Sequence, residues 1–145
     1  MVFAPVLALS LAAVPRPPEI WSARTIGCQF EFRTSVTWSD APPQIIEEPI
    51  QPPLVDLYTD IDSTKGTAQR QGEQWTTQVV ASPAGPGLGI QDKSVMPFGS
   101  FTLIHDTEAS RKLRPGYRPA IKTTHMAIGQ AAVTVQEFGW CRILD

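Results

Sequence analysis

The sequence predicts an all-β fold, a small antiparallel barrel or sandwich of about seven or eight strands. Short segments in which apolar and polar residues alternate recur along the chain, with turn-forming residues between them. Fourteen prolines and ten glycines among 145 residues fit many short strands better than long helices. The first and last of these segments each carry one of the two cysteines, so we predict that a disulfide joins the first and last strands.

Length and composition favour one folded domain. An apolar content of 42% is near the globular average and argues against wholesale disorder, and the net charge of −2 argues against a nucleic-acid partner. Residues 34–64 hold six acids and no Lys or Arg. Solvated loop charges and a polarised molecule that steers a partner both remain open as interpretations of this asymmetry.

Residues 1–14 resemble a signal peptide, because their apolar run is too short to span a bilayer and has the length of a hydrophobic leader core. Small residues at Ser10 and Ala12 provide a cleavage pattern. No Lys or Arg precedes the run and Pro5 interrupts it, so a buried N-terminal segment is the alternative. We expect a periplasmic or secreted protein with no transmembrane segment after leader removal.

Residues 15–25 are predicted to be an extended, proline-rich lead-in to a single β domain spanning residues 26–145. The first strand, 26–38, has the clearest alternation in the chain. Its apolar side includes Cys28, Phe30 and Phe32, which we expect to be buried together.

Residues 39–53 contain five prolines. Because proline cannot donate a hydrogen bond to a sheet, this segment is expected to be a long connection across one end of the fold. Strands are predicted at 54–62, 67–71 and 74–82, with a loop at 83–87 and brief pairing at 88–90.

The second half of the domain should begin with a strand at 98–105. Asp106 or Thr107 is positioned to cap one helical turn that ends near Leu113. A strand at 117–128 and a turn at 129–130 lead into the last strand, 132–144. Its alternation breaks around Gly139, which predicts a bulge there or burial on both faces.

Cys28 and Cys141 are the predicted disulfide, since two cysteines in an exported chain most simply pair with each other. Closing a loop of this length stabilises the fold by about 4–5 kcal/mol in the chain-entropy model. Two buried free thiols are the alternative.

A cluster of cations is the candidate site for an anion or a partner. Arg111, Lys112, Arg114 and Arg118 lie within eight residues and beside Tyr117. On a loop, such a group can bind phosphate, an acidic polysaccharide or the carboxylates of a partner. A solvated loop without a ligand is the alternative interpretation.

His105 and His125 are the two histidines and the only support for a hydrolase. A hairpin centred on Pro115 would place them opposite each other, whereas a wider loop at 106–116 would set Phe101 opposite Ile121 and separate them. The chain has no GxSxG, GxGxxG or Walker A motif. We expect no cofactor, no metal and no catalytic residue.

The sequence therefore favours a non-catalytic binding module of the cell envelope, with an envelope protein or an anionic ligand as its partner. A barrel that carries a small apolar molecule is the first alternative. A hydrolase that uses His105 or His125 is the second.

Overall fold

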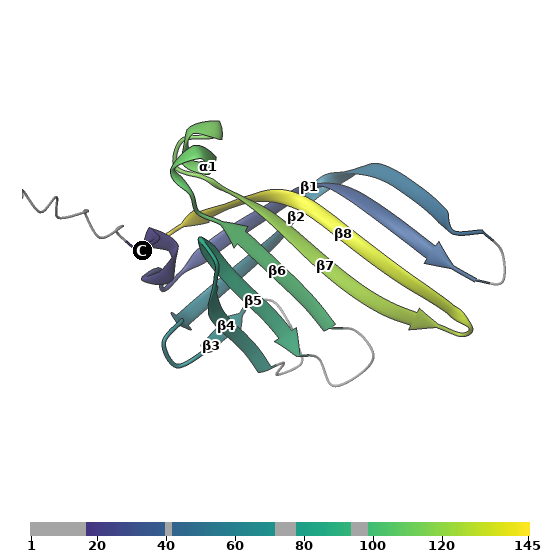
Figure 1. Cartoon of the computed structure of the whole chain (residues 1–145), viewed down its shortest axis with the longest axis horizontal. Helices are drawn as coiled ribbons and strands as arrows, with labels where there is room; N and C mark the ends of the chain where they lie inside the picture. The colour runs from purple at the N-terminus through teal and green to yellow at the C-terminus, as the bar shows by residue number, and fades with distance from the viewer. Residues whose placement is uncertain (1–16, 40–41, 72–77, 94–98) are drawn as a thin grey trace, which may run out of the picture.

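A computed structural model describes residues 17–39, 42–71, 78–93 and 99–145. Within these residues, eight strands form one closed antiparallel barrel in which sequence neighbours pair and β8 closes onto β1 (Figure 1). The strands are β1 (Ile26–Trp38), β2 (Gln44–Asp62), β3 (Thr67–Arg70), β4 (Gln78–Ala84), β5 (Gly87–Lys93), β6 (Gly99–His105), β7 (Arg118–Ile128) and β8 (Ala131–Ile143). The 3-10 helix η1 (Glu19–Trp21) precedes them, and α1 (Glu108–Leu113) joins β6 to β7. The predicted all-β fold, an antiparallel barrel or sandwich of about seven or eight strands, is confirmed, and the closed sheet makes it a barrel. The predicted leader, 1–14, lies outside the described residues.

The disulfide between Cys28 and Cys141 joins the first and last strands, as predicted. The two cysteines are directly paired across the β1–β8 ladder and are fully buried. The C-terminus adds further contacts, because the Asp145 carboxylate accepts hydrogen bonds from the backbone N–H groups of Arg24 and Thr25. The two ends of the barrel sheet are therefore held together covalently and by hydrogen bonds.

A bulge in β1 changes which side chains face the barrel interior. The register with β8 shifts between Phe30, which pairs with Gly139, and Phe32, which pairs with Phe138. Phe30 is buried, but Phe32 lies outside at 40% exposure with its ring 6.4 Å from that of Phe138. The expectation that Phe30 and Phe32 share the buried face was wrong, because the bulge at Glu31 reverses the alternation.

The bulge or two-faced burial predicted for the last strand near Gly139 was wrong in its place: the bulge lies in β1, opposite that glycine, and the β7–β8 register is continuous there. A Cβ at Gly139 would stand 2.0 Å from the carbonyl oxygen of Gln29. The absence of a side chain lets the bulged β1 backbone approach β8 this closely.

The proline-rich segment is part of a strand, so the predicted connection at 39–53 was wrong for most of its length. β2 runs without a break through Pro49, Pro52 and Pro53; it pairs with β1 up to Pro49 and again from Leu54. The prolines are tolerated because β2 pairs with β3 only from Tyr58 onward. Over the proline-rich part, no second strand among the described residues pairs with β2, so none of them needs its N–H groups there.

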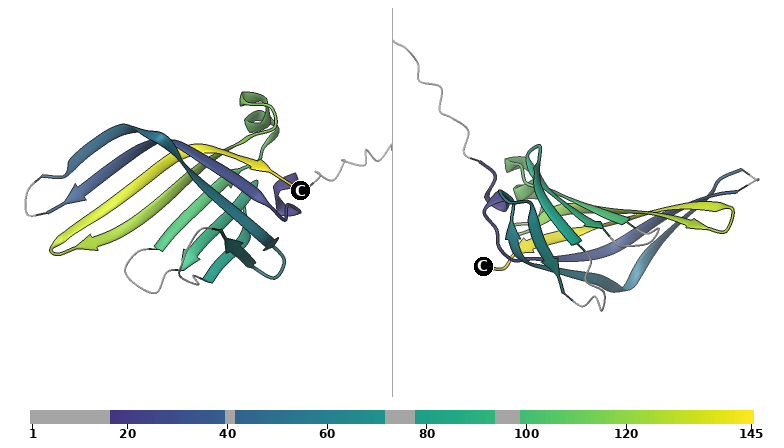
Figure 2. Two further views of the ribbon diagram at one scale, coloured as in Figure 1. Left: turned by 180° about the vertical axis from the view of Figure 1, so that it is seen from behind. Right: turned by 90° about the horizontal axis from the view of Figure 1, so that it is seen from below.

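η1 packs across one end of the barrel, which we call the closed end (Figure 2). Ile20 is fully buried in the core, and the Trp21 indole N–H donates to the Gly87 carbonyl at 2.7 Å. The apolar core consists of Ile20, Ala23, Ile26, Cys28, Phe30, Tyr58, Ile61, Val79, Ala81, Leu88, Ile90, Ile104, Ala120 and Cys141. α1 lies at the same end (Figure 1).

At the opposite end, β1, β2, β7 and β8 continue past the shorter strands as a four-stranded sheet (Figures 1 and 2). We call this sheet the distal ribbon and define it as residues 34–38 of β1, 44–48 of β2, 124–128 of β7 and 131–136 of β8. Strand order across the ribbon is β2–β1–β8–β7.

Candidate binding surfaces

Asp106 organises the predicted cationic loop at the closed end. Its buried carboxylate accepts hydrogen bonds from the Ile20 backbone N–H at 3.1 Å, from Arg111 Nε at 2.7 Å and from Arg118 Nε. Burial alone would raise the pKa of Asp106, but the hydrogen bonds from Arg111, Ile20 and Arg118 outweigh it and lower that pKa. Arg118 also donates to Glu19 at 3.1 Å. Two of the predicted cations are thus bound to the protein itself.

The short helix α1 fixes the position of this loop. Thr107, one of the two predicted caps, is the N-cap residue of α1. Its hydroxyl accepts a hydrogen bond from the Ser110 backbone N–H, and the Ser110 hydroxyl accepts one from the Thr107 backbone N–H. Lys112 pairs with Glu108 one turn earlier at 2.8 Å, on the exposed face.

Arg114 and Tyr117 form a stacked pair on the outer wall. The Arg114 guanidinium lies 4.1 Å from the centre of the Tyr117 ring and 5.7 Å from that of Trp140. It is also 3.7 Å from the Glu31 carboxylate. The five predicted residues therefore lie together, and every cation among them already faces a carboxylate of the chain. Their anion-binding role stays a prediction.

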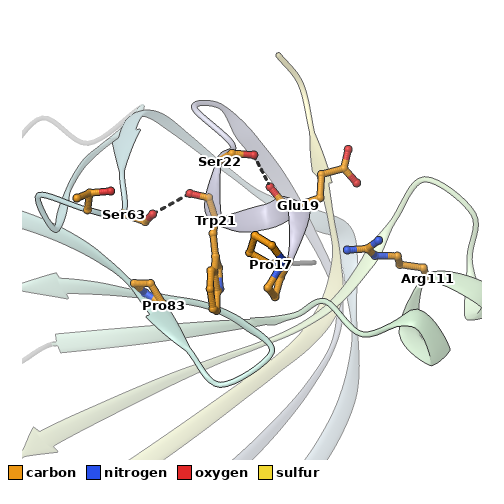
Figure 3. A pocket seen from close by; sticks show the side chains of 9 residues that line it. Pro17, Glu19, Trp21, Ser22, Ser63, Pro83 and Arg111 are labelled. Carbon is orange, nitrogen blue, oxygen red and sulfur yellow. Dashed lines mark hydrogen bonds between the residues drawn. The ribbon is translucent and has the colours of Figure 1, made fainter. Parts of the chain in front are cut away.

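An open cleft of about 680 Å³ lies beside this loop (Figure 3). Its lining comes from η1, the β2–β3 turn, β4 and α1, and consists of Pro17, Pro18, Glu19, Trp21, Ser22, Ser63, Thr64, Pro83 and Arg111. The Ser63 hydroxyl donates to the Trp21 carbonyl at 2.7 Å, which fixes one wall. Arg111 stands at the rim with two nitrogens already bound by Asp106. The cleft therefore presents prolines and hydroxyls rather than an uncompensated charge.

The barrel interior contains a cluster of charged side chains that sequence analysis missed. Lys122 lies 2.9 Å from Asp56 and 3.7 Å from Glu137. Arg70 bridges Asp56, at 2.6 Å, and Asp92, at 3.0 Å. Among the described residues, Asp92 Oδ1 is the one buried side-chain nitrogen or oxygen without a hydrogen-bond partner. These residues come from β2, β3, β5, β7 and β8, so the cluster crosses the interior.

Mutual neutralisation makes this buried cluster tolerable. Burial opposes ionisation of Asp56, but Lys122 and Arg70 more than compensate and lower its pKa. Tyr58 is hydrogen-bonded to Thr102 at 3.2 Å, and burial raises the pKa of its phenol. These polar groups occupy the part of the interior where a carrier of apolar molecules needs an apolar surface.

The two histidines lie at opposite ends of β6. His105 ends that strand, whereas His125 of β7 pairs with Gly99 at its beginning. Leu103 faces Ile121 and Phe101 faces Thr123, so neither predicted hairpin register is the observed one. His125 shares a hydrogen bond with Thr134 at 3.2 Å. The histidines do not form a joint site, and the described residues contain no cluster of His, Cys, Asp and Glu suited to a metal.

The distal ribbon is the most unusual surface of the described structure, and it exposes apolar side chains on both faces. Strand pairing places Val36 beside Ile45 on the outer face and Ser35 beside Ile46 on the inner face. Ile45 is 65% exposed and Ile46 54%. Trp38, on the outer face, is 54% exposed. A sheet projecting this way has no core of its own to cover either face.

The ribbon is also almost without charge. Glu47 and Glu48 are the only Asp, Glu, Lys or Arg in its four segments, and Glu48 is paired with Arg33 at 2.8 Å. Depletion of charge is the compositional signature of interface cores. The run without Asp, Glu, Lys or Arg from residue 123 to 136 was the sequence signal that could have revealed this surface.

Among the described residues, no helix is long and apolar enough to cross a membrane. Comparison with known proteins found no family model, curated protein or solved structure that matches this chain.

Proposed function

We propose that this protein is a non-catalytic binding module of the cell envelope that engages a protein partner through its distal ribbon. The observation that carries the proposal is the ribbon itself, an exposed sheet with apolar side chains on both faces and hardly any charge. Large exposed apolar patches on soluble proteins mark interaction sites.

Export from the cytoplasm is supported by two features. The disulfide between Cys28 and Cys141 is buried and structural, and such bonds persist in oxidising compartments. The apolar segment at 1–14 has the composition of a leader.

A protein partner fits the ribbon better than a lipid bilayer does. Both margins of the ribbon, β2 and the end of β7, lack a second strand neighbour among the described residues. Unpaired backbone N–H and C=O groups are excluded from the hydrocarbon of a membrane. A partner chain can satisfy them by adding a strand, a common mode of recognition.

Site-specific photo-cross-linking in the producing cell tests this function. A photoreactive residue replaces Ile45 on the ribbon or, as the matched control, Glu108 on α1, which is also exposed. The ribbon position should give discrete adducts and the α1 position should not. The partner is then identified, purified and titrated. We expect Ile45→Glu to weaken binding at least about tenfold, because it places a charge in an apolar contact.

The opposite pattern would overturn the proposal. Adducts only at position 108, or equal affinities for the wild-type protein and Ile45→Glu, would assign the partner surface to the closed end. Hydrolysis or carriage of an apolar molecule by the purified protein would support one of the alternative functions.

A further inference from the structure

The free edge of β2 in the distal ribbon offers a short, well-bounded segment for pairing with another strand. Residues 44–48 pair with β1 on one side, and β3 does not reach them on the other. Pro43 precedes this segment and Pro49 follows it. Because proline has no N–H to donate, these five residues are the stretch between the two prolines in which no residue lacks a backbone donor.

We propose that the partner of this edge is a second copy of the chain, paired antiparallel about a two-fold axis at Ile46. This inference rests on the proposed function and names its partner. In that register Ile46 faces Ile46 of the second copy, Ile45 faces Glu47, and Gln44 faces Glu48. The two-fold pairing uses the whole window between the prolines in both copies, as an isologous interface requires.

The charges of the segment are compatible with this register. No acid is placed directly opposite another acid, which is the arrangement that destabilises a strand pair. Glu48 faces the neutral Gln44 and is already compensated by Arg33 at 2.8 Å. A parallel in-register pair would instead set Glu47 against Glu47 and Glu48 against Glu48.

The apolar side chains also favour a second copy over an unrelated chain. Ile46 is 54% exposed at the centre of the window and would pack against its own equivalent. Pairing across the axis makes one continuous sheet from two ribbons that both lack charge beyond Glu47 and Glu48. Interfaces between identical chains are more apolar than those of transient complexes, and charged residues are depleted from interface cores.

Disulfide cross-linking at a single introduced cysteine tests the register. The Cβ atoms of directly opposed residues in an antiparallel pair lie about 4.5–5.5 Å apart, close enough for a disulfide to form with a small adjustment. Diagonal neighbours lie about 7–8 Å apart. Ile46→Cys should therefore form a covalent dimer under mild oxidation. Ile45→Cys, at the next and more exposed position, is the matched control. It should give at least about tenfold less covalent dimer, because residue 45 is only a diagonal neighbour of its own equivalent in this register. Cys28 and Cys141 are buried and already paired, so they do not compete.

Sedimentation equilibrium tests the same contact without a new thiol. We expect a weak dimer that forms between about 10 μM and 1 mM, because five residues a side make a small interface. Ile46→Glu should abolish it by placing two carboxylates opposite each other at the axis. Ile128→Glu adds the same charge to a 59% exposed ribbon residue on β7 and should leave the dimer intact.

Each other outcome overturns this inference. A monomer at every concentration, equal cross-linking at positions 45 and 46, or loss of the dimer only in Ile128→Glu would do so. The proposed function fails separately, through the photo-cross-linking pattern: adducts at position 45 to a different envelope protein would uphold the function and reject the second copy. Binding of the monomer to phosphatidylglycerol vesicles, abolished by Ile46→Glu, would assign the edge to lipid instead.

Discussion

Replacing Lys122 with methionine tests whether the interior charge cluster holds the barrel together. Lys122 supplies one of the two cations that compensate Asp56, and it also lies 3.7 Å from Glu137. Methionine keeps an unbranched apolar side chain in the same space and removes the charge. The substitution leaves Arg70 as the one cation bound to Asp56 and Asp92 among the described residues.

The expected loss of stability is about 3 kcal/mol. Removing one partner of a buried ion pair typically costs about 3–5 kcal/mol, because the remaining charge stays buried without compensation. The lower end applies here because Arg70 remains 2.6 Å from Asp56. A loss of this size lowers Tm by about 6–12 °C in a chain of this length.

Chemical denaturation at pH 7 with the disulfide intact measures the effect. Lys65→Met is the matched control, since Lys65 pairs with Asp62 at 3.2 Å but is 78% exposed at its side chain, and it should leave the midpoint unchanged. Adding Asp56→Asn to Lys122→Met should cost less than the sum of the two single changes, because it removes the uncompensated charge. A Lys122→Met protein within about 1 kcal/mol of wild type would refute the ion-pair account.

Three further outcomes are expected. Asp106 has a lowered pKa in the folded state, so its contribution to stability is present above about pH 4 and is lost as pH falls through that lowered pKa. In denaturation experiments at a series of pH values, Asp106→Asn should therefore reduce the fall in stability with acidification. Replacing both Cys28 and Cys141 with alanine should lower the free energy of unfolding by about 4–5 kcal/mol, given their separation of 113 residues, and an equally stable variant would show that the bridge is dispensable. Gly139→Ala should lower the free energy of unfolding by about 3 kcal/mol, because its Cβ would lie 2.0 Å from a backbone oxygen of β1. Gly99→Ala, whose Cβ would have its nearest atom at 3.6 Å, should be close to neutral. Similar thermal midpoints for the two variants would contradict the close approach of β1 and β8.

Local alternation was sufficient to predict most of the strands. β1 has the predicted bounds, and β7 and β8 begin and end within one residue of their predicted limits. The disulfide could be predicted because its two cysteines lie in the first and last alternating segments, which a closed sheet brings together. These features depend on neighbouring residues or on the order of the strands, and the sequence displays both.

The charged interior could not be predicted because it depends on partners far apart in the chain. Alternation alone would turn Val55 inward and Asp56 outward, whereas Val55 is 67% exposed and Asp56 is buried. Asp56 is buried because Arg70 and Lys122 arrive from other strands to compensate it. Part of the acidic excess at 34–64 is therefore compensated by basic residues across the barrel interior and does not polarise the surface.

The prolines of β2 led to the wrong prediction of a connection at 39–53, also because their effect depends on a distant part of the chain. Their effect on a strand depends on whether a second neighbour needs the missing N–H groups. Within the part of the chain that the structure describes, that neighbour is absent along the ribbon, and no local pattern in the sequence reveals this. The same fact leaves the edge open, so the feature that hid the strand from sequence analysis is the one on which the proposed interface depends.

Hydrogen–deuterium exchange along β2 tests the docking surface most directly, whatever chain occupies it. Backbone N–H groups in residues 44–48 that point away from β1 have no strand partner among the described residues and should exchange quickly in the isolated protein. On formation of the complex, protection should rise there and remain unchanged across α1. Protection that appears instead at α1 and the 111–118 loop, with 44–48 unaffected, would contradict the central claim.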